Sequence, residues 1–476
     1  MTHSLRLRLA VLSCSLLVCT VFASRASTAQ DSRSQKLESQ FQSAVTLYHA
    51  GKLTEAAAQL EIIVPNLPKS FEVHELLGLV YAAQSQNKKA AEQLEIAVRL
   101  KPDSAVARMN LATCLSNSDE PELAEIQFRK ALALQPQDFE ANHNLADFYI
   151  QSNKISVALP LLEHAQAINP SSYANGYDLA LAYLLTGRLG DARTLTEKLL
   201  QLRNTGELHN LLGQIDEKDG KFVQAANEFE IAAQMDPSED NLFAWGSELL
   251  LHRTYGPAIE VFWQAIQRYP DSPRLLIGQG MALYSLSRYE ESIKSLLAAA
   301  DLSPADPRCY LFLSKSYLSS PNQADDVIRT FQRYSELQPG NALAQYYYAM
   351  SLWKGKRLEN SSVNFRAVES LLQKSIALDG KLPETHLQLG ILYADQHEFD
   401  KSFPEYQRAL ELNPNLPDAH YRLGQYYVHA GQKDQAQQEF AVYQQLEKQR
   451  LAAVDKERAE VQQFVYSAKS GPVAKP

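Results

Sequence analysis

Proline recurs along this chain at a nearly constant interval, and this interval constrains the fold more than any other feature. Pro68, Pro102, Pro136 and Pro170 stand 34 residues apart. The series continues with small slips at Pro237, Pro270, Pro304, Pro339 and Pro414. A period of this length predicts one supersecondary unit stacked many times. Such a stack offers a long curved binding surface rather than an enclosed catalytic pocket.

Each period contains two runs with helical spacing. In the first run, a small residue such as Gly78 is followed three places later by an apolar or aromatic residue such as Tyr81. The second run has the form of Ala90, Leu94 and Ala97. Proline then ends the second helix, because it lacks an amide hydrogen and clashes with the preceding turn. The pattern predicts two antiparallel helices per unit, and the small residue lets neighbouring helices approach closely.

Residues 71–104 carry the pattern most completely, with His74, Leu77, Gly78, Tyr81, Ala90, Leu94, Ala97 and Pro102. This arrangement resembles the tetratricopeptide repeat. Units in the same phase begin near residues 37, 71, 105, 139, 173, 206, 239, 273, 307, 342, 383 and 417. The resemblance covers nearly all of the mature chain. It implies an all-α fold, a right-handed α-solenoid of about twelve antiparallel helix pairs, with the first helix of each pair on the concave face.

The ends of the chain depart from the repeat. Residues 1–29 have a basic start, a short apolar stretch and small residues, which predicts a secretory signal peptide and export to a periplasmic or extracellular location. Lipidation at Cys14 or Cys19 is a less favoured alternative. We expect a polar leader at 30–36, repeats 1–5 at 37–205 and repeats 6–12 at 206–450. A loop insertion is expected at 355–367, a C-terminal capping helix at 451–466 and a disordered tail at 467–476.

Composition and motifs narrow the function. The chain has 46 basic and 55 acidic residues, which argues against a nucleic-acid partner. After the signal peptide, no stretch is long and apolar enough to span a membrane, so the only envelope association left open is peripheral or lipid-anchored. Cys114 and Cys309 lie in distant units, so we expect buried thiols and no disulfide. The shortened turn near Arg203 fits either a variant connection, which is favoured, or a hinge between two half-solenoids.

No pattern in the sequence indicates a catalytic or cofactor site, so no cofactor is expected. The segment from His74 to Gly78 begins like a zinc-protease helix but lacks the second histidine. The recurrent histidines at His74, His209, His386 and His420 each occupy one packing place per unit, so packing is a better interpretation than metal ligation.

The candidate binding surface lies in repeats 7–10, where the positions expected on the concave face are unusually apolar. Its predicted members are Phe243, Leu250, Arg274, Ile277, Met281, Tyr284, Arg308, Leu311, Lys315, Tyr346, Met350, Trp353 and Lys354. Aromatic and methionine side chains beside a few cations suit a peptide with apolar anchors and an acidic group. For any single member, packing in the core is an equally good interpretation.

A second, weaker candidate is formed by Asn110, Asn144 and Asp178, which occupy one equivalent place in three successive units. Repeated asparagines at this place grip a peptide backbone in related proteins. The arrangement that clamps a C-terminal carboxylate in some family members is absent, because its asparagine place holds Thr113, Asp147, Leu181 and Gln214.

These observations predict an exported, non-enzymatic adaptor that binds a peptide or protein segment in its concave groove and helps to assemble an envelope complex. The alternative is a polysaccharide-binding protein of the envelope, in which Tyr284, Tyr346 and Trp353 stack on sugar rings. Neutralising Lys315 and Lys354 would separate the two, since only a peptide site should weaken.

Overall fold

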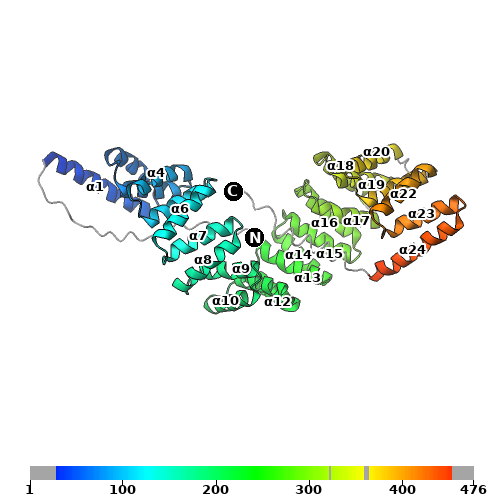
Figure 1. Ribbon diagram of the computed structural model, residues 1–476, viewed down its shortest axis with the longest axis horizontal. Coiled ribbons are helices and arrows are strands. Elements are labelled where there is room, and N and C mark those ends of the chain that lie inside the picture. The colour runs from blue at the N-terminus through cyan, green and yellow to red at the C-terminus, as the bar shows by residue number, and fades with distance from the viewer. Residues whose placement is uncertain (1–27, 321–322, 359–363, 453–476) are drawn as a thin grey trace. The chain divides into compact units, whose positions relative to one another are not determined.

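The computed structural model describes residues 28–320, 323–358 and 364–452. Over these ranges the chain forms 24 α-helices and one short 3-10 helix, and it has no β-strand (Figure 1). The described helices divide into two compact units between Asp219 and Gly220. We call them the N-terminal unit and the C-terminal unit and describe each by itself. The predicted all-α fold of twelve helix pairs is confirmed.

The N-terminal unit holds five helix pairs and the first helix of the sixth. Its helices are α1 (Thr28–His49), α2 (Leu53–Ile63), η1 (Val64–Asn66), α3 (Phe71–Ala83), α4 (Asn87–Leu100), α5 (Ala105–Ser116), α6 (Pro121–Leu134), α7 (Phe139–Gln151), α8 (Ile155–Ile168), α9 (Tyr173–Leu185), α10 (Leu189–Leu202) and α11 (Gly206–Lys218).

The C-terminal unit begins with the second helix of the sixth pair. Its helices are α12 (Phe222–Met235), α13 (Glu239–Leu251), α14 (Tyr255–Arg268), α15 (Pro273–Ser285), α16 (Tyr289–Leu302), α17 (Arg308–Ser319), α18 (Ala324–Leu337), α19 (Ala342–Leu358), α20 (Phe365–Leu378), α21 (Pro383–Asp395), α22 (Phe399–Leu412), α23 (Pro417–His429) and α24 (Lys433–Ala452).

A short polar residue starts most first helices at the expected place. The Ser104 hydroxyl accepts a hydrogen bond from the Ala107 amide, and Asp138 does the same for Ala141. Ser70, Ser172, Thr205, Ser238 and Ser272 cap their helices in the same way. Each cap satisfies an amide that would otherwise lack a partner in the first helical turn. The proline that ends one unit and the cap that begins the next therefore fix the connection between units.

The two helices of each pair meet at the small residue identified in the sequence. A Cβ atom on Gly78 of α3 would lie 2.6 Å from Cγ of Leu94 on α4. The equivalent Cβ on Gly280 of α15 would lie 2.6 Å from Cγ of Leu296 on α16. Both leucines are fully buried. The helices thus approach to a distance that only glycine permits at these two places.

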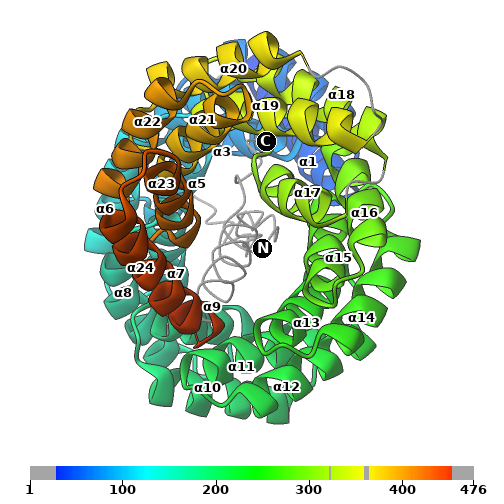
Figure 2. The same cartoon turned by 90° about the vertical axis from the view of Figure 1, so that its right-hand side faces the viewer.

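Within each unit the helices form two layers. Successive odd-numbered helices contact one another, for example α13 with α15 and α15 with α17. Figure 2 shows these odd-numbered helices on the inner side of each curved stack and the even-numbered helices outside, as the resemblance implied. We call the odd-numbered helices the inner layer and the even-numbered helices the outer layer. The buried apolar side chains lie between the two layers.

Three local expectations can be compared with the structure. Residues 30–36, expected as a polar leader, belong to helix α1. Residues 355–358, expected to begin a loop, extend α19 by one turn, because lysine, arginine and leucine favour a helix over a turn. The shortened connection at Arg203 leaves α10 and α11 in contact, and the division between the units falls later, at Asp219.

Three predicted segments at the ends of the chain fall largely or wholly outside the described residues. The signal peptide at 1–29 enters the described range only at its last two residues. The capping helix expected at 451–466 enters it only where α24 ends at Ala452, and the tail at 467–476 lies beyond it.

Candidate protein-binding surfaces

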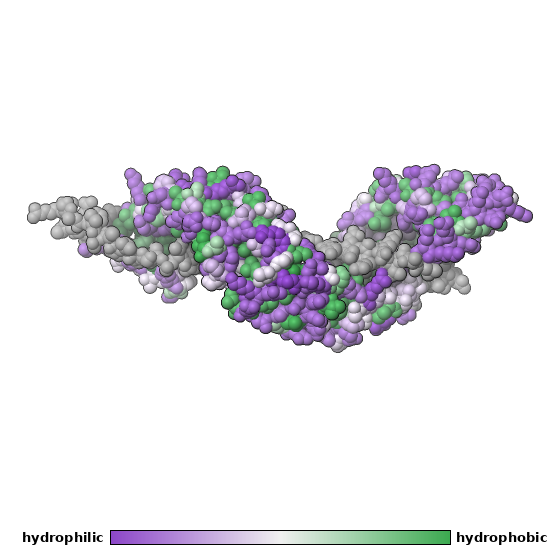
Figure 3. All heavy atoms as spheres, turned by 60° about the horizontal axis from the view of Figure 1, so that its bottom comes forward, coloured by the Kyte–Doolittle hydropathy of each residue, from purple (hydrophilic) through white to green (hydrophobic). Residues whose placement is uncertain are grey.

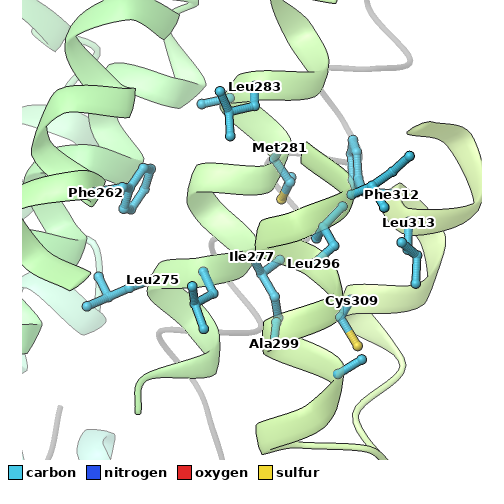
Figure 4. Packing of buried hydrophobic residues seen from close by; sticks show 14 of the residues in the cluster. Phe262, Leu275, Ile277, Met281, Leu283, Leu296, Ala299, Cys309, Phe312 and Leu313 are labelled. Atoms are coloured by element: carbon cyan, nitrogen blue, oxygen red, sulfur yellow. The ribbon is translucent and has the colours of Figure 1, made fainter. Parts of the chain in front are cut away.

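The predicted surface of repeats 7–10 lies on α13, α15, α17 and α19 of the inner layer, but six of its members are buried. Phe243, Leu250, Ile277 and Met281 are at most 1% exposed, and Trp353 and Met350 are 4% and 8% exposed. Figure 4 shows Ile277 and Met281 among Leu296, Cys309 and Phe312. The expectation that these six side chains are exposed in a groove is therefore wrong. They pack against neighbouring helices, because the next repeat covers the apolar positions that lie beside the contact between paired helices.

The other members of this surface keep part of their area exposed. Tyr284, Leu311 and Tyr346 are half-buried at the edge of the core of the C-terminal unit. The ring of Tyr284 contacts Phe312 edge to face, with centroids 5.6 Å apart. We define the inner-layer aromatic tract as Tyr284, Leu311, Tyr346 and the neighbouring Lys315. This tract holds the aromatic and apolar members of the predicted surface that remain partly exposed.

Three of the four cations of the predicted surface contact acids or aromatic rings. Arg274 pairs with Glu239 and Asp240 at 2.7 and 2.6 Å. Its guanidinium also lies 4.9 Å from the centre of the Phe243 ring. Arg308 pairs with Asp306 at 2.6 Å. The Lys315 ammonium lies 5.2 Å from the centre of the Phe312 ring, so this cation sits over an aromatic face at the tract. Lys354 is half-buried near the end of α19.

Three of the four recurrent histidines contact a polar side chain on the second helix of their own repeat. His74 Nδ1 lies 2.8 Å from Gln93, and His386 Nδ1 lies 2.7 Å from Glu405. His420 makes the same contact with Glu439. In each case the partner lies 19 residues later, on the second helix. The preference for packing over metal ligation is thus supported by these contacts. His209 instead lies 2.7 Å from Asn204 in the preceding turn.

A separate group of polar side chains lies on the inner layer of the N-terminal unit, on α7, α9 and α11. Asp147 and Asp178 are both buried, each 6% exposed. His143 on α7 donates a hydrogen bond from Nδ1 to Oδ1 of Asn175 on α9, at 3.2 Å. On α9, the hydroxyl of Tyr173 donates to Glu207 of α11 at 3.4 Å. We call Asp147, Asp178 and Glu207 the acidic pocket.

Burial and mutual repulsion alter the titration of this group. Burial, with the charges of Asp147 and Glu207, raises the pKa of Asp178 to about 8. Burial also raises the pKa of Asp147, against the opposing effect of His143. The pKa of His143 is itself lowered by burial. Near pH 7 this group therefore contains a neutral His143 imidazole and a mostly protonated Asp178.

The sequence indicates Asp178 as a member of the weaker candidate site. It indicates Asp147 only as a residue that replaces the asparagine of the carboxylate-clamping arrangement. The signal was present in the sequence, because two acids fall on inner-layer positions of successive units. What the sequence did not indicate was their burial. Asn110, the first member of that row, is also buried at 4% exposed, and Asn144 is half-buried.

The described residues give no indication of a metal centre or a membrane span. Among residues 28–320, 323–358 and 364–452, no three His, Cys, Asp or Glu side chains are placed to hold a metal ion. Over the same ranges, none of the helices combines the length and the apolar character that a bilayer crossing requires. Cys114 and Cys309 are buried and unpaired, as predicted, and burial raises the pKa of the Cys114 thiol to about 12.

The fold and these surfaces define a helical-repeat scaffold, and comparison with known proteins specifies its family. Models described as tetratricopeptide repeat match residues 75–139, 152–215, 243–307, 383–416 and 405–438, which together make up just over half of the chain. The chain belongs to the tetratricopeptide-repeat family. Proteins of this family are generally non-enzymatic scaffolds for protein–protein contacts.

One curated relative is a small glutamine-rich tetratricopeptide repeat-containing protein 2 of Mycosarcoma maydis. It is 24% identical over 125 residues, which is 26% of this chain and 35% of that protein. The match thus spans about a third of the relative's length.

Similar solved structures include the C-terminal part of a repeat-containing protein of Cytophaga hutchinsonii, with a TM-score of 0.43 and 16% identity, covering 52% of this chain and 98% of that one. Another is YrrB, described as a TPR protein with an unusual peptide-binding site, with a TM-score of 0.32 and 20% identity, covering 38% of this chain and 95% of that one. At these identities the likeness concerns the fold alone.

Proposed function

We propose that the protein is an exported, non-enzymatic adaptor that binds a peptide or protein segment on its inner layer and helps to assemble a complex of the cell envelope. The observation that carries the binding proposal is the inner-layer aromatic tract. Tyr284, Leu311 and Tyr346 keep exposed area beside the Lys315 cation, on helices that the core holds in place. Aromatic anchors next to a cation suit a segment with an apolar residue and an acid.

The surface favours a few separate binding residues over one large apolar patch. On the face that Figure 3 presents, hydrophobic and hydrophilic side chains are interspersed. A scaffold of this kind gains affinity from a few anchors, since most contact residues contribute little to binding. The tract offers such anchors without requiring a contiguous apolar surface.

Affinity capture from an envelope extract tests the proposal. Residues 30–476 are used as bait, in parallel with the variant Tyr284→Ala/Tyr346→Ala and with Lys315→Gln. Trp353 is left in place, because it is buried and its loss would disturb the fold. We expect a specific protein to be retained by the wild type and reduced at least about tenfold by each variant.

The matched control is Trp263→Ala, which removes a large aromatic side chain, 53% exposed, from α14 of the outer layer. Capture by this variant should equal that of the wild type. Equal capture by the tract variants, with unchanged circular dichroism, would show that the tract is not the binding surface.

Polysaccharide binding remains the alternative, because partly exposed tyrosines also stack on sugar rings. The burial of Trp353 removes one of the three rings on which that interpretation depends. Neutralising Lys315 and Lys354 separates the two functions. A peptide ligand with an acidic group should lose affinity in Lys315→Gln/Lys354→Gln, whereas an uncharged glycan should bind as before.

Export is tested by the mature N-terminus. Mass spectrometry of the protein from its own cells should find residues 1–29 removed and the remainder outside the cytoplasm. An intact N-terminus in the cytoplasmic fraction would exclude the envelope role while leaving the binding proposal in place.

A further inference from the structure

One carboxyl oxygen of the acidic pocket, on Asp147, is left unsatisfied by the fold. Oδ1 of Asp147 is buried and has no hydrogen-bond partner. The other oxygen of this carboxylate accepts one bond, from Gln151 at 3.3 Å. Buried polar atoms are nearly always paired, and a buried carboxylate without partners is costly. An orphaned acceptor of this kind on a binding layer indicates a donor that arrives with a ligand.

The groups that act on Asp147 and Asp178 are acidic or neutral, whereas the Arg203 guanidinium lies 5.4 Å from the centre of the Tyr173 ring, whose hydroxyl donates to Glu207. Asp147 from α7 and Glu207 from α11 both act on Asp178 of α9. His143 is the base that acts on Asp147, and burial favours its neutral form. Tyr177 stays a neutral phenol, because burial and the nearby acids Glu207 and Asp178 raise its pKa. When Asp147 and Asp178 ionise, they therefore carry a negative charge that neither His143 nor Tyr177 balances.

We propose that the acidic pocket formed by Asp147, Asp178 and Glu207 binds the cationic side chain, arginine or lysine, of an extended protein segment lying along the inner layer of repeats 4–6. A guanidinium or ammonium group supplies both the donor that Asp147 Oδ1 lacks and the opposite charge. Asn110 and Asn144 continue along the same layer, where Asn110 is buried and Asn144 is half-buried. No described trio of ligands suits a metal ion instead.

This inference goes beyond the proposed function, since it concerns other repeats and another charge class of ligand. Its failure would leave the aromatic tract untouched, and failure of envelope capture would leave the pocket untouched. The two sites also lie in different units, so each can be mutated separately.

The test measures the binding of fluorescently labelled hexaarginine to the full mature chain by anisotropy, at about 150 mM salt to screen non-specific attraction. Hexacitrulline, in which each guanidinium is replaced by a neutral urea group of nearly the same shape, is the matched probe. We expect hexaarginine to bind and hexacitrulline to bind at least about tenfold more weakly. Equal binding of the two probes would overturn the proposal.

Substitutions locate the site. Asp147→Asn and Asp178→Asn keep the size of each side chain and remove its negative charge. Each is expected to weaken hexaarginine binding at least about tenfold. Glu122→Gln removes one charge at an exposed position of α6 in the outer layer and should change affinity less than about twofold. An equal loss in all three variants would show that only the net charge of the chain attracts the probe.

The pH dependence distinguishes a binding role from a structural one. A cation favours the ionised form of Asp178, whose pKa is about 8 in the unliganded protein, so binding near pH 7 must release a proton. Calorimetry in two buffers of different ionisation enthalpy should detect close to one proton released. Affinity for hexaarginine should rise by about a hundredfold from about pH 6 to about pH 9, since one proton is released below a pKa of about 8 and arginine does not titrate in this range.

Asp178→Asn should abolish both the proton release and the pH dependence. Thermal melts establish whether each variant is folded. If an asparagine variant does not fold, the wild type alone decides, because binding that is independent of pH and releases no proton would overturn the proposal.

Discussion

At the scale of single residues, acids removed from water lower the stability of the folded chain, because burial disfavours their ionised form. Asp147 and Asp178 in the N-terminal unit are buried acids whose pKa values are raised, and the pKa of the half-buried Glu75 on α3 is also raised. Burial raises the pKa of Glu75 to about 7, with Glu72 adding to the effect and Lys101 opposing it. Such groups are kept where they serve a purpose or where packing leaves no alternative. The two cases are separable by experiment.

Glu75 gives a prediction with a defined sign. Its folded-state pKa lies above the unfolded value of 4.5, so the stabilising effect of the bound proton is complete below pH 4.5 and lost as pH rises through 7. A glutamine side chain at this position would resemble the protonated glutamic acid. We expect Glu75→Gln to match the wild type at about pH 5 and to be more stable by about 1–2 kcal/mol at about pH 8, after allowing for solvent screening.

The measurement is the urea midpoint of unfolding at the two pH values. Glu122→Gln, at an exposed position, serves as the control and should show no such difference between the two pH values. A Glu75→Gln variant that is equally stable relative to the wild type at both pH values would contradict the raised pKa.

At the scale of helices, a capping residue begins the first helix of most units. Its contribution to stability can be tested by comparing two neighbouring serines. The Ser172 hydroxyl accepts a hydrogen bond from the Asn175 amide at the start of α9. Its exposed neighbour Ser171 bonds only to Asn169. We expect Ser172→Ala to cost about 1 kcal/mol and Ser171→Ala to cost less than about 0.5 kcal/mol, both measured by urea unfolding. Equal costs would show that the cap does not matter here.

The seam between paired helices gives a second prediction at this scale. Alanine at position 280 would place its Cβ 2.6 Å from Leu296, so the two helices must move apart. We expect Gly280→Ala to destabilise the C-terminal unit by about 1–3 kcal/mol. Apart from its chain neighbours and its own helix, Gly256 on α14 has no heavy atom within 4 Å of the position of such a Cβ. Gly256→Ala should therefore change the stability by less than about 0.5 kcal/mol, because the helix preference of alanine is opposed by its contact with the following Pro257. Equal stability of the two variants would contradict the close approach seen at Gly280.

The helices themselves were predictable, because period, cap and proline all point to the same boundaries. The starts of α3, α5 and α7 fall on the predicted residues 71, 105 and 139. The binding residues were not predictable to the same degree. Met281 and Tyr284 lie three positions apart on α15, yet one is buried and the other is partly exposed. The difference depends on how closely the next unit approaches, and a single repeat in the sequence does not encode that distance.

At the scale of the whole molecule, the repeat architecture determines how far a local change spreads. Helices contact their partner in the pair and the adjacent pair, so stability is a sum of repeat terms and nearest-neighbour interfaces. The buried clusters follow this pattern, since each is made of side chains from consecutive helices. A chain of this kind does not unfold as one cooperative body.

Hydrogen exchange of the Gly280→Ala variant measures this spread. We expect faster exchange in α15 and α16 and, to a smaller degree, in α14 and α17, because these helices share the interfaces that the added methyl group disturbs. Helices α3 to α8 in the N-terminal unit should exchange as in the wild type. The reciprocal experiment uses Ser172→Ala, which should affect α8 to α11 and leave α15 and α16 unchanged. A uniform increase over all helices in either variant would mean that the chain unfolds cooperatively. In that case ligands at the acidic pocket and at the aromatic tract would stabilise each other, whereas local exchange predicts that the two sites bind independently.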